Sequence, residues 1–517
     1  MMKMLCLLLA VFMLPLLPRH AIAEEMTGMT ATEIVARMGI GWNLGNTFDA
    51  TGGDPRDIYS QEQSWGNPIV DEALIKRVKD AGFTTIRIPI TWYRHVSEDG
   101  LYTINPDFMN RIREVVDLAY ASDLYVIINM HHENWVNIPT LDKDYEQVGV
   151  QLSAMWRQIA DAFADYDQRL IFESMNEPRM AGTKLEWTGN SAGSKAVNYL
   201  NQVFVDTVRT DAKGYNGERA LMIPGYAASS SSNLMRAITI PTVDGKQAEN
   251  IIVSVHCYNP YDFCLSDKMV DFDRFNKSHT QSIDSVFTNI QRIFLDQGIP
   301  VVMGETSATN TNHNTESREN WAYHMGYKAA AYGVPICVWD NGNNNTSGGE
   351  CHCWVRRSQN PKLRSQKNPL PYPTVAEALF AGAASIAWGT GREAVQLPKS
   401  KLNGTVLWAN TNGQEVGKSA PLLLDSKAEW YAQGRQFAVM YTGDGIVQLV
   451  LTCGGEEITI EAAAANQVSG RMVAWFPYDH VIKVLSDAGV DAPTQVTKIT
   501  VTANATVTAY EFCYVGK

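Results

Sequence analysis

Two glutamates that end apolar runs are the residues of this chain best placed to do chemistry. Residues 170–178 read as a buried strand that ends at Glu177 and is broken by the next residue, a proline. Residues 299–305 read as a second strand, which ends at Glu305. A pair of carboxyl groups can cleave a glycosidic bond, because one protonates the leaving oxygen while the other works at the anomeric carbon. Their surroundings must then differ, since the two acids need different protonation states.

Each glutamate also has a simpler interpretation, because either one alone could be an ordinary solvated residue at a strand end. Asn176, the amide beside Glu177, strengthens the chemical interpretation. It could hydrogen-bond the 2-hydroxyl of a sugar, a contact that strengthens in the transition state. The two acids together, in this setting, favour catalysis.

The elements that must position these acids alternate regularly between residues 30 and 385. Short β-branched runs predict eight strands, at residues 39–44, 84–89, 125–129, 170–176, 220–224, 251–256, 301–305 and 335–340. Amphipathic runs predict helices at residues 71–81, 107–121, 145–164, 196–210, 283–297, 317–332 and 373–384. The strands are almost entirely apolar, as expected when both faces are buried. We therefore predict an α/β fold, a (β/α)8 TIM barrel spanning residues 24–387.

A barrel of this kind carries its active site at the carboxyl ends of its strands. Polar and aromatic residues do follow several predicted strands, namely Asn43, Arg87, His131, His132, Asn176, Glu177, His256, Tyr258, Glu305 and Trp339. Their convergence on one rim, from separate strands, agrees with the prediction of an active site.

The pattern of apolar and polar residues changes after the barrel region. Residues 388–396 read as a linker, and residues 397–517 hold short alternating runs punctuated by Gly and Asn, with one short helical stretch near residues 481–488. This pattern predicts a smaller all-β sandwich domain.

The first 23 residues read as a signal peptide. Lys3 precedes an apolar run at residues 5–17, and residues 20–23 have the small-x-small pattern of a cleavage site. The run is too short to span a bilayer comfortably, and no other stretch is apolar enough. We predict cleavage after Ala23 and secretion of the remainder.

The net charge and composition of the chain restrict the kinds of molecule that it is expected to bind. The 517-residue chain has a formal net charge of −12 and a pI near 5.4, which argues against nucleic acid or an anionic membrane surface. A neutral polysaccharide places no demand on net charge, and we expect a monomer. Cys6 is lost with the signal, which leaves Cys257, Cys264, Cys337, Cys351, Cys353, Cys453 and Cys513. Export permits disulfides, and the odd count leaves at least one thiol outside an internal pair.

Six short motifs follow one another in the barrel region: Gly41-Trp42-Asn43-Leu44-Gly45-Asn46-Thr47, Ile86-Arg87-Ile88-Pro89, Asn129-Met130-His131-His132, Asn176-Glu177-Pro178, His256-Cys257-Tyr258 and Gly304-Glu305. Together they resemble glycoside hydrolase family 5, most closely its bacterial endo-β-1,4-glucanase (cellulase) subfamily. The C-terminal region resembles a carbohydrate-binding module in size, placement and β content.

The resemblance implies a retaining double displacement that needs no cofactor and no metal, with Glu177 as general acid/base and Glu305 as nucleophile, about 5 Å apart. It implies that β-glucan is the substrate. The candidate substrate-binding residues are Asn43, Arg87, His131, His132, Asn176, His256, Tyr258, Trp339 and Trp135. Within this set Arg87 would hold the nucleophile and Trp339 would stack under a glucosyl ring.

Several residues also have structural interpretations. Arg87 could pair with Glu173, which alternates onto the strand face of Glu177. His132 could simply pack beside His131; read as metal ligands, this pair has no nearby carboxylate to complete a hydrolytic site. Trp135 could equally be a sugar platform or a packed side chain. At the level of function, the alternatives are the same mechanism on xyloglucan, xylan or mannan, a non-catalytic polysaccharide-binding protein, and a metal-dependent hydrolase.

Overall fold

The computed structural model describes residues 28–516 apart from residues 267, 312–313, 347–349, 358–369, 393–401, 403, 419, 428–429, 432, 469 and 491. The predicted signal peptide and Cys6 lie outside the described residues. The chain divides after Arg392 into two compact units.

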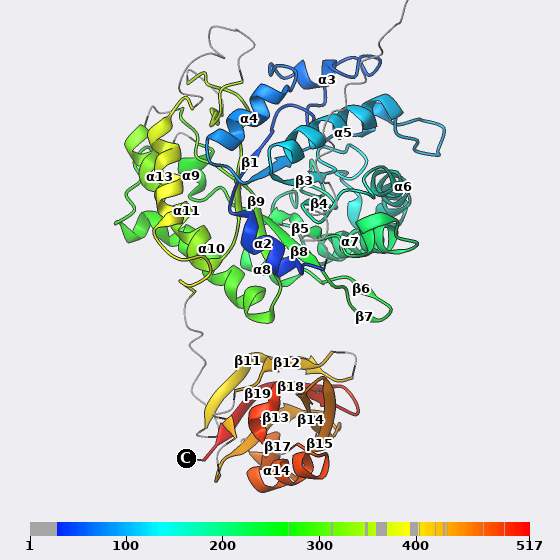
Figure 1. Ribbon diagram of the computed structural model, residues 1–517, viewed down its shortest axis with the longest axis vertical. Coiled ribbons are helices and arrows are strands. Elements are labelled where there is room, and N and C mark those ends of the chain that lie inside the picture. The colour runs from blue at the N-terminus through cyan, green and yellow to red at the C-terminus, as the bar shows by residue number, and fades with distance from the viewer. Residues whose placement is uncertain are drawn as a thin grey trace, which may run out of the picture. The chain divides into compact units, whose positions relative to one another are not determined.

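The first unit is a closed barrel of eight parallel strands, and it confirms the predicted (β/α)8 fold (Figure 1). Around the barrel the strands follow the order β1-β10-β9-β8-β5-β4-β3-β2. Their bounds are β1 (Ile40–Asn43), β2 (Thr85–Ile88), β3 (Tyr125–Asn129), β4 (Leu170–Glu173), β5 (Leu221–Ser229), β8 (Ile251–His256), β9 (Val301–Thr306) and β10 (Ile336–Val338). An antiparallel pair, β6 (Thr242–Val243) and β7 (Lys246–Gln247), lies outside the barrel sheet.

Four predicted strands extend past the carboxyl end of the observed ones, and the fourth strand is the one that matters most for the site. The strand predicted at residues 170–176 stops at Glu173, so Glu177 lies in the loop after β4 and not on the strand itself. Beyond β4 the amide of Ser174 donates to Met222 of β5, whereas that of Asn176 donates to Met130 beyond β3. The chain therefore stays on the rim of the barrel but no longer pairs as a regular strand.

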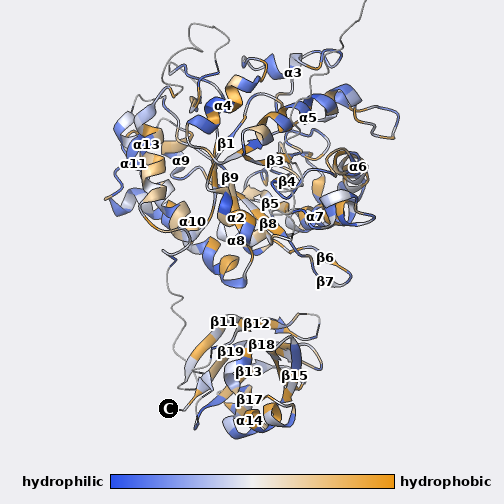
Figure 2. Ribbon diagram, in the orientation of Figure 1, coloured by the Kyte–Doolittle hydropathy of each residue, from blue (hydrophilic) through white to orange (hydrophobic). Residues whose placement is uncertain are grey.

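Helices surround the strands, and in Figure 2 hydrophilic and hydrophobic segments alternate along them, as expected for amphipathic helices. The main ones are α4 (Glu72–Asp80), α5 (Pro106–Ala121), α6 (Leu141–Ala162), α7 (Ser191–Arg209), α10 (Lys277–Ile293), α11 (Thr315–Tyr332) and α13 (Pro373–Ala384). Shorter ones are α3 (Ser60–Gln63), α8 (Ser232–Arg236) and α9 (Tyr261–Cys264). Local signals explain several bounds. Asp71 caps α4 through the amide of Leu74, and α5 has a proline at its first position. Gly333 ends α11 in the left-handed conformation.

The barrel interior is closed at its amino end by α2 (Ala31–Met38). Ile34 and Met38 of this helix pack in one buried cluster with strand residues that include Ile127, Ile171 and Val302. This apolar plug fills the bottom of the barrel, so only the carboxyl end of the strands is left for polar groups.

The second unit consists of two antiparallel sheets, as predicted for the C-terminal region, with a main buried cluster and a second, smaller one. The sheets have the orders β11-β19-β13-β17-β16 and β12-β18-β14-β15. Their elements are β11 (Thr405–Val416), β12 (Leu422–Asp425), β13 (Gln436–Thr442), β14 (Val447–Cys453), β15 (Glu456–Glu461), β16 (Ala464–Val468), β17 (Arg471–Pro477), α14 (Tyr478–Asp487), β18 (Val496–Ala503) and β19 (Val507–Val515). Burial alternates along β14, as expected for a strand with one face on a core.

The predicted linker begins inside the first unit. The amides of Gly389 and Gly391 donate to Ala330 and Ala331 of α11, at 2.6 and 2.9 Å. Residues 388–392 therefore pack against the barrel, and residues 393–396 lie outside the described part of the chain. All seven remaining cysteines are buried, and within the described residues none of them forms a disulfide. No helix within the described residues is long and apolar enough to cross a membrane.

Candidate active site

The two glutamates meet at the carboxyl end of the barrel. Glu305 lies near the end of β9 and Glu177 lies in the loop after β4. One carboxyl oxygen of each, together with a ring nitrogen of His256, fall within 4.8 Å of one another. Retaining glycosidases hold their two carboxyl groups about 5–5.5 Å apart, whereas inverting enzymes leave about 6.5–9.5 Å for a water. The spacing of the pair fits the retaining geometry.

Arg87 of β2 donates hydrogen bonds to several side chains of the site. Its Nη1 donates to Oε1 of Glu305 at 2.8 Å, and its Nε donates to Oε2 of Glu173 at 2.7 Å. The remaining Nη2 donates to the Asn176 amide oxygen at 2.8 Å. Burial opposes the charge of this guanidinium, but Glu173 and Glu305 outweigh it and raise the pKa of Arg87 above its usual value. The arginine thus stays charged and holds these three side chains, and its Nη1 also donates to a fourth, Asn43, at 3.0 Å.

Glu173 is the structural member of this cluster. It is fully buried, and besides Arg87 it accepts hydrogen bonds from Ser254 Oγ at 2.7 Å and from Asn129 Nδ2 at 3.0 Å. The predicted Arg87–Glu173 pair is therefore confirmed, and the same arginine also holds Glu305. Because protein donors surround its carboxylate, Glu173 is not placed to react with a substrate.

Glu177 is held by the side chains of His256 and Arg179. His256 Nδ1 lies 2.8 Å from its Oε1, and Arg179 Nη1 lies 3.6 Å from its Oε2. Burial raises the pKa of Glu177, but the hydrogen bond and charge of His256 outweigh burial and leave the pKa below its usual value. Burial lowers the pKa of His256, but Glu305 and Glu177 outweigh it and leave this pKa above its usual value. His256 therefore keeps its proton more readily, and Glu177 loses its proton more readily, than either group does in water.

The second oxygen of Glu305 accepts a hydrogen bond from Tyr258 Oη at 2.9 Å. His131 approaches the first oxygen, with its Nε2 at 3.9 Å. Burial lowers the pKa of His131 well below its usual value, so the ring is neutral. Its Nδ1 lies 3.2 Å from Asn129 Nδ2; an amide nitrogen only donates, so Nε2 carries the hydrogen that points toward the site.

Trp339 lies over His131, with the ring centroids 5.8 Å apart and the planes 6° from parallel. Gly45 sits beneath it, because a Cβ at that position would come within 2.8 Å of the indole. Gly304 serves His256 in the same way, since a Cβ there would lie 3.0 Å from Nε2. Two glycines of the motifs are thus needed for close approach.

Three predicted substrate-binding residues lie apart from the glutamate pair. Asn43 is fully buried, and its amide donates to Gly304 O at 2.9 Å while accepting from Arg87 at 3.0 Å. It therefore supports Arg87 from beneath the site. His132 is half-buried beside the ring of Trp65 at 5.9 Å. Trp135 is half-buried, and its indole donates to Glu133 at 2.7 Å.

A carboxylate does lie near the two histidines, contrary to the sequence prediction. Asp49, His131 and His132 each present one potential ligand atom within 4.8 Å of the others. The prediction missed Asp49 because it comes from the loop after β1, far away in sequence. Both oxygens of Asp49 already accept backbone amides, from Asn46 at 3.0 Å and from Thr47 at 2.6 Å. Asp49 therefore shapes its own loop.

Sequence reasoning also missed residues that brace the rim. The buried Asp340 accepts from the Trp42 indole at 2.7 Å and pairs with Arg357 at 2.9 Å. Burial raises the pKa of Glu133 to about 7 although Trp92, Trp135 and Tyr93 donate to it. Asp340 follows directly after Trp339 and Glu133 directly after His132, so their positions at strand ends were the available signal.

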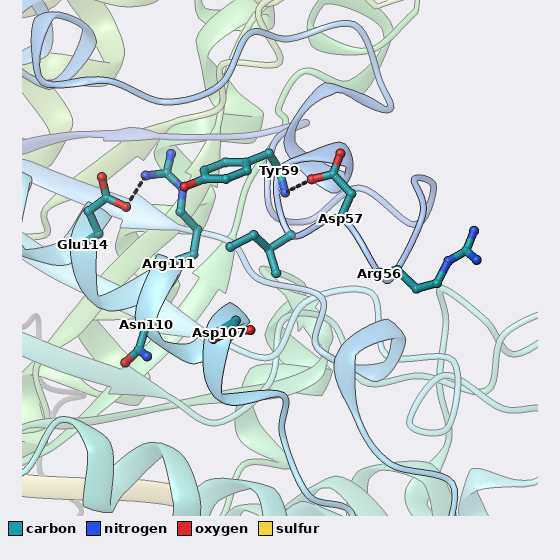
Figure 3. A pocket seen from close by; sticks show the side chains of 8 residues that line it. Arg56, Asp57, Tyr59, Asp107, Asn110, Arg111 and Glu114 are labelled. Atoms are coloured by element: carbon teal, nitrogen blue, oxygen red, sulfur yellow. Dashed lines mark hydrogen bonds and ion pairs between the residues drawn. The ribbon is translucent and has the colours of Figure 1, made fainter.

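A surface pocket of about 520 Å³ lies elsewhere, between the loop at residues 56–59 and α5 (Figure 3). Its lining consists of Arg56, Asp57, Ile58, Tyr59, Asp107, Asn110, Arg111 and Glu114. None of the predicted site residues lines it. Within it Arg111 pairs with Glu114 at 2.8 Å, and the guanidinium lies 5.2 Å from the ring of Tyr59. The pocket belongs to the outer wall of the barrel.

Known proteins share this barrel. A family model described as cellulase (glycosyl hydrolase family 5) matches residues 48–345. Endoglucanase A of Clostridium longisporum is 42% identical over 335 residues, which are 64% of this chain and 63% of that protein, just under two thirds of its length. The structure of a broad-specificity endoglucanase from Ruminococcus flavefaciens aligns with a TM-score of 0.62 at 40% identity, over 69% of this chain and 97% of that one. A lichenase from Caldicellulosiruptor sp. F32 aligns with a TM-score of 0.63 at 34% identity, over 69% and 96%.

Proposed function

Because this chain belongs to glycosyl hydrolase family 5, the cellulase family, we propose that it is a retaining endo-β-1,4-glucanase acting on cellulose-like and mixed-linkage β-glucans. The observation that carries the proposal is the spacing of the Glu177 and Glu305 carboxyl oxygens, within 4.8 Å. That spacing suits a direct attack by one carboxylate and is shorter than the about 6.5–9.5 Å that separates the carboxyl groups of inverting enzymes.

In the first step Glu305 attacks the anomeric carbon and forms an ester with it, while a proton from Glu177 goes to the oxygen of the leaving sugar. In the second step water attacks the same carbon, its proton passes to Glu177, and the ester to Glu305 breaks. Arg87 and Tyr258 hold the two oxygens of Glu305, at 2.8 and 2.9 Å, so that the nucleophile is aimed before the sugar arrives.

The proton on the His256–Glu177 pair becomes available to the leaving oxygen only as the first step proceeds. While Glu305 is an anion it is the largest influence that raises the pKa of His256. When Glu305 bonds to the sugar, that charge is lost, and His256 holds its proton less strongly. The proton can then cross the 2.8 Å hydrogen bond to Glu177 and the leaving oxygen. His256 is in this account the reservoir of the catalytic proton.

The stereochemistry of the product tests the mechanism. Proton NMR during hydrolysis of a soluble β-glucan should show the β anomer of the new reducing end first, followed by slow mutarotation. An initial α anomer would contradict the proposal. In E177A, with 2,4-dinitrophenyl β-cellobioside as substrate, the leaving group departs without an acid and the glycosyl ester still forms. Added azide should then speed turnover and yield a β-glycosyl azide, because azide needs no general base to attack the ester.

The choice of polysaccharide is the second part of the proposal. A reducing-end assay on carboxymethyl cellulose, mixed-linkage glucan, xyloglucan, xylan and mannan measures it. We expect the first two to be the best substrates. Support comes from relatives named endoglucanase and from a structural neighbour named lichenase. A dominant rate on xylan or mannan would reject the assignment and keep the mechanism.

We further propose that the protein is exported and that its C-terminal unit binds glucan. Trp430 and Tyr431 are buried in the core of that unit, whereas Trp408, Trp475 and Tyr478 are half-buried and remain the candidates for stacking on sugar. Pull-down of the full chain carrying E305Q by insoluble cellulose, compared with the same chain carrying W408A as well, tests this. Equal retention of both proteins would remove Trp408 from the proposal.

A further inference from the structure

The pocket between the loop at residues 56–59 and α5, here called the outer pocket, is built around an exposed tyrosine (Figure 3). Its volume of about 520 Å³ falls within the roughly 300–1,000 Å³ that sites for small ligands usually have. Tyr59 is 40% exposed and lines the pocket. The guanidinium carbon of the buried Arg111 lies 5.2 Å from the centroid of its ring. One face of the ring is thus supported by a fixed side chain.

The arginines of the outer pocket are already neutralised. Arg111 pairs with Glu62 and with Glu114, both at 2.8 Å. Arg56 pairs with Asp54 at 2.8 Å. An anion would have to displace a carboxylate from one of these arginines, and breaking the buried pair of Arg111 is costly. The outer pocket therefore does not favour a phosphate or another anionic ligand.

Three polar groups of the outer pocket are free to bind a ligand. Within the described residues, the Tyr59 hydroxyl, the Asp107 carboxylate and the Asn110 amide group have no hydrogen-bond partner. Asp107 and Asn110 are exposed and lie three positions apart on α5, hence on one face of the helix (Figure 3). A flat aromatic ring with free hydrogen-bonding groups beside it suits a neutral sugar, which has an apolar face and hydroxyls that both donate and accept.

The loop that carries Tyr59 also reaches the rim of the barrel. Earlier in this loop, Asp49 presents an oxygen within 4.8 Å of a ring nitrogen of His131. Trp65 comes six positions after Tyr59, and its ring lies 5.9 Å from that of His132. Six residues span at most about 20 Å of chain. The outer pocket is therefore close enough to the rim for one polymer chain to contact both.

We propose that the outer pocket is a second, non-catalytic binding site for a β-glucan chain. A glucosyl unit stacks on the ring of Tyr59, and its hydroxyls bond to Asp107 and Asn110. The identity of the sugar rests on the proposed function. A polymer held in the outer pocket keeps its neighbouring segments near the glutamate pair, which raises their effective concentration there. A substrate too short to reach from the pocket to the rim gains nothing.

Hydrogen exchange reads the outer pocket separately from the active site. In the full chain carrying E305Q, cellohexaose should slow exchange in the peptides that cover residues 56–64 and residues 106–114. Concentrations up to about 10 mM fill most of a site whose Kd is about 1 mM. Adding Y59A and N110A should abolish this protection and keep that of the peptide containing Glu177. Protection of the active site alone in E305Q would overturn the second site.

Kinetics of the otherwise native chain gives an independent readout. For Y59A/N110A we expect kcat/KM on mixed-linkage glucan to fall about fivefold, and that on 2,4-dinitrophenyl β-cellobioside to stay the same. Y59F, which keeps the ring, should lower the rate on glucan by about twofold or less. In Y59A/N110A, an unchanged rate on glucan, or an equal fall on both substrates, would overturn the second site. Asp107 is kept in these variants because its charge also stabilises the first turn of α5.

The matched control is a tyrosine of similar exposure on another helix. Tyr199 of α7 is 38% exposed, and its ring lies 4.9 Å from that of Tyr145. Y199A should leave the ratio of the two rates unchanged, and a fivefold fall of that ratio would remove the link to the outer pocket. A wild type that releases dinitrophenol but cleaves no β-glucan would refute the proposed function. Normal cleavage of glucan, with no protection of the outer pocket in E305Q, would refute the second site alone.

Discussion

Two buried arginines of this barrel each pair with two glutamates, yet the two arginines have different roles. Arg87, inside the barrel, pairs with Glu173 at 2.7 Å and with Glu305 at 2.8 Å. Arg111, on α5, pairs with Glu62 at 2.8 Å and with Glu114 at 2.8 Å. A buried arginine between two carboxylates therefore does not by itself identify an active site.

The difference lies in what each carboxylate still faces. Glu305 is held by Arg87 on one oxygen, yet it also faces Glu177 across less than 4.8 Å. Glu62 is fully buried and has Arg111 and the amide of Val70 as partners. A catalytic carboxylate is thus held by protein donors and still faces a second acid.

The largest expected effect comes from exchanging the acid for its amide in each cluster. E305Q should lower kcat on β-glucan by about 10⁴-fold or more, because an amide cannot form the glycosyl ester. E62Q should leave kcat of the folded enzyme within about twofold and destabilise the fold by about 3 kcal/mol, because it leaves Arg111 buried and poorly paired. Steady-state kinetics and thermal unfolding of both variants measure the contrast. A loss of turnover in E62Q as deep as in E305Q would erase the distinction between the clusters.

A pH-dependent effect of intermediate size should mark only the active-site cluster. The pKa of His256 is raised above 6.5, since Glu305 and Glu177 outweigh burial. The pKa of Glu177 is lowered below 4.5, since His256 outweighs burial. The stabilisation from His256 is complete below pH 6.5 and is lost as pH rises through its raised pKa. The stabilisation from Glu177 is present above pH 4.5 and is lost as pH falls through its lowered pKa.

H256N keeps a neutral side-chain donor and removes this titration. The difference in Tm between wild type and H256N should therefore be greatest between about pH 4.5 and about pH 6.5, and should shrink on both sides. Differential scanning calorimetry across this range measures it. A difference that does not vary with pH would show that the pair holds no shared proton.

The smallest effect is expected at Glu114, the exposed partner of Arg111. The side chain of Glu114 is 58% exposed, so water screens its pairing with Arg111. E114Q should change the free energy of unfolding by about 0.5 kcal/mol or less and leave kcat unchanged. Chemical denaturation detects such a change, and a loss of 2 kcal/mol or more would mean that this surface pair is far stronger than its exposure allows.

The sequence predicted the strands well because each barrel strand is a short apolar run with both faces buried. β3 and β8 have the bounds that the pattern predicted. The end of β4 was wrong because Ser174 and Asn176 hydrogen-bond alternately to opposite neighbours, an arrangement that has no signature in the sequence.

The glutamate pair was predicted because both residues end apolar runs. Arg179 and Asp49 were not, because their contacts depend on how the loops after β4 and β1 fold back over the rim. Asn43 was predicted to bind substrate, but it is buried under the site. A sequence motif identifies residues that lie near the active site. The fold determines which of their polar atoms can still reach a substrate.

The most direct test of the central claim is to trap the covalent intermediate. A 2-deoxy-2-fluoro-cellobioside with a dinitrophenyl leaving group should inactivate the enzyme, because the fluorine slows both steps while the good leaving group keeps formation of the ester faster than its hydrolysis. Peptide mass spectrometry should then find the fluorocellobiosyl group on the peptide that contains Glu305, and E305Q should remain unlabelled. Label on Glu177, or none on any carboxylate while turnover continues, would contradict the account.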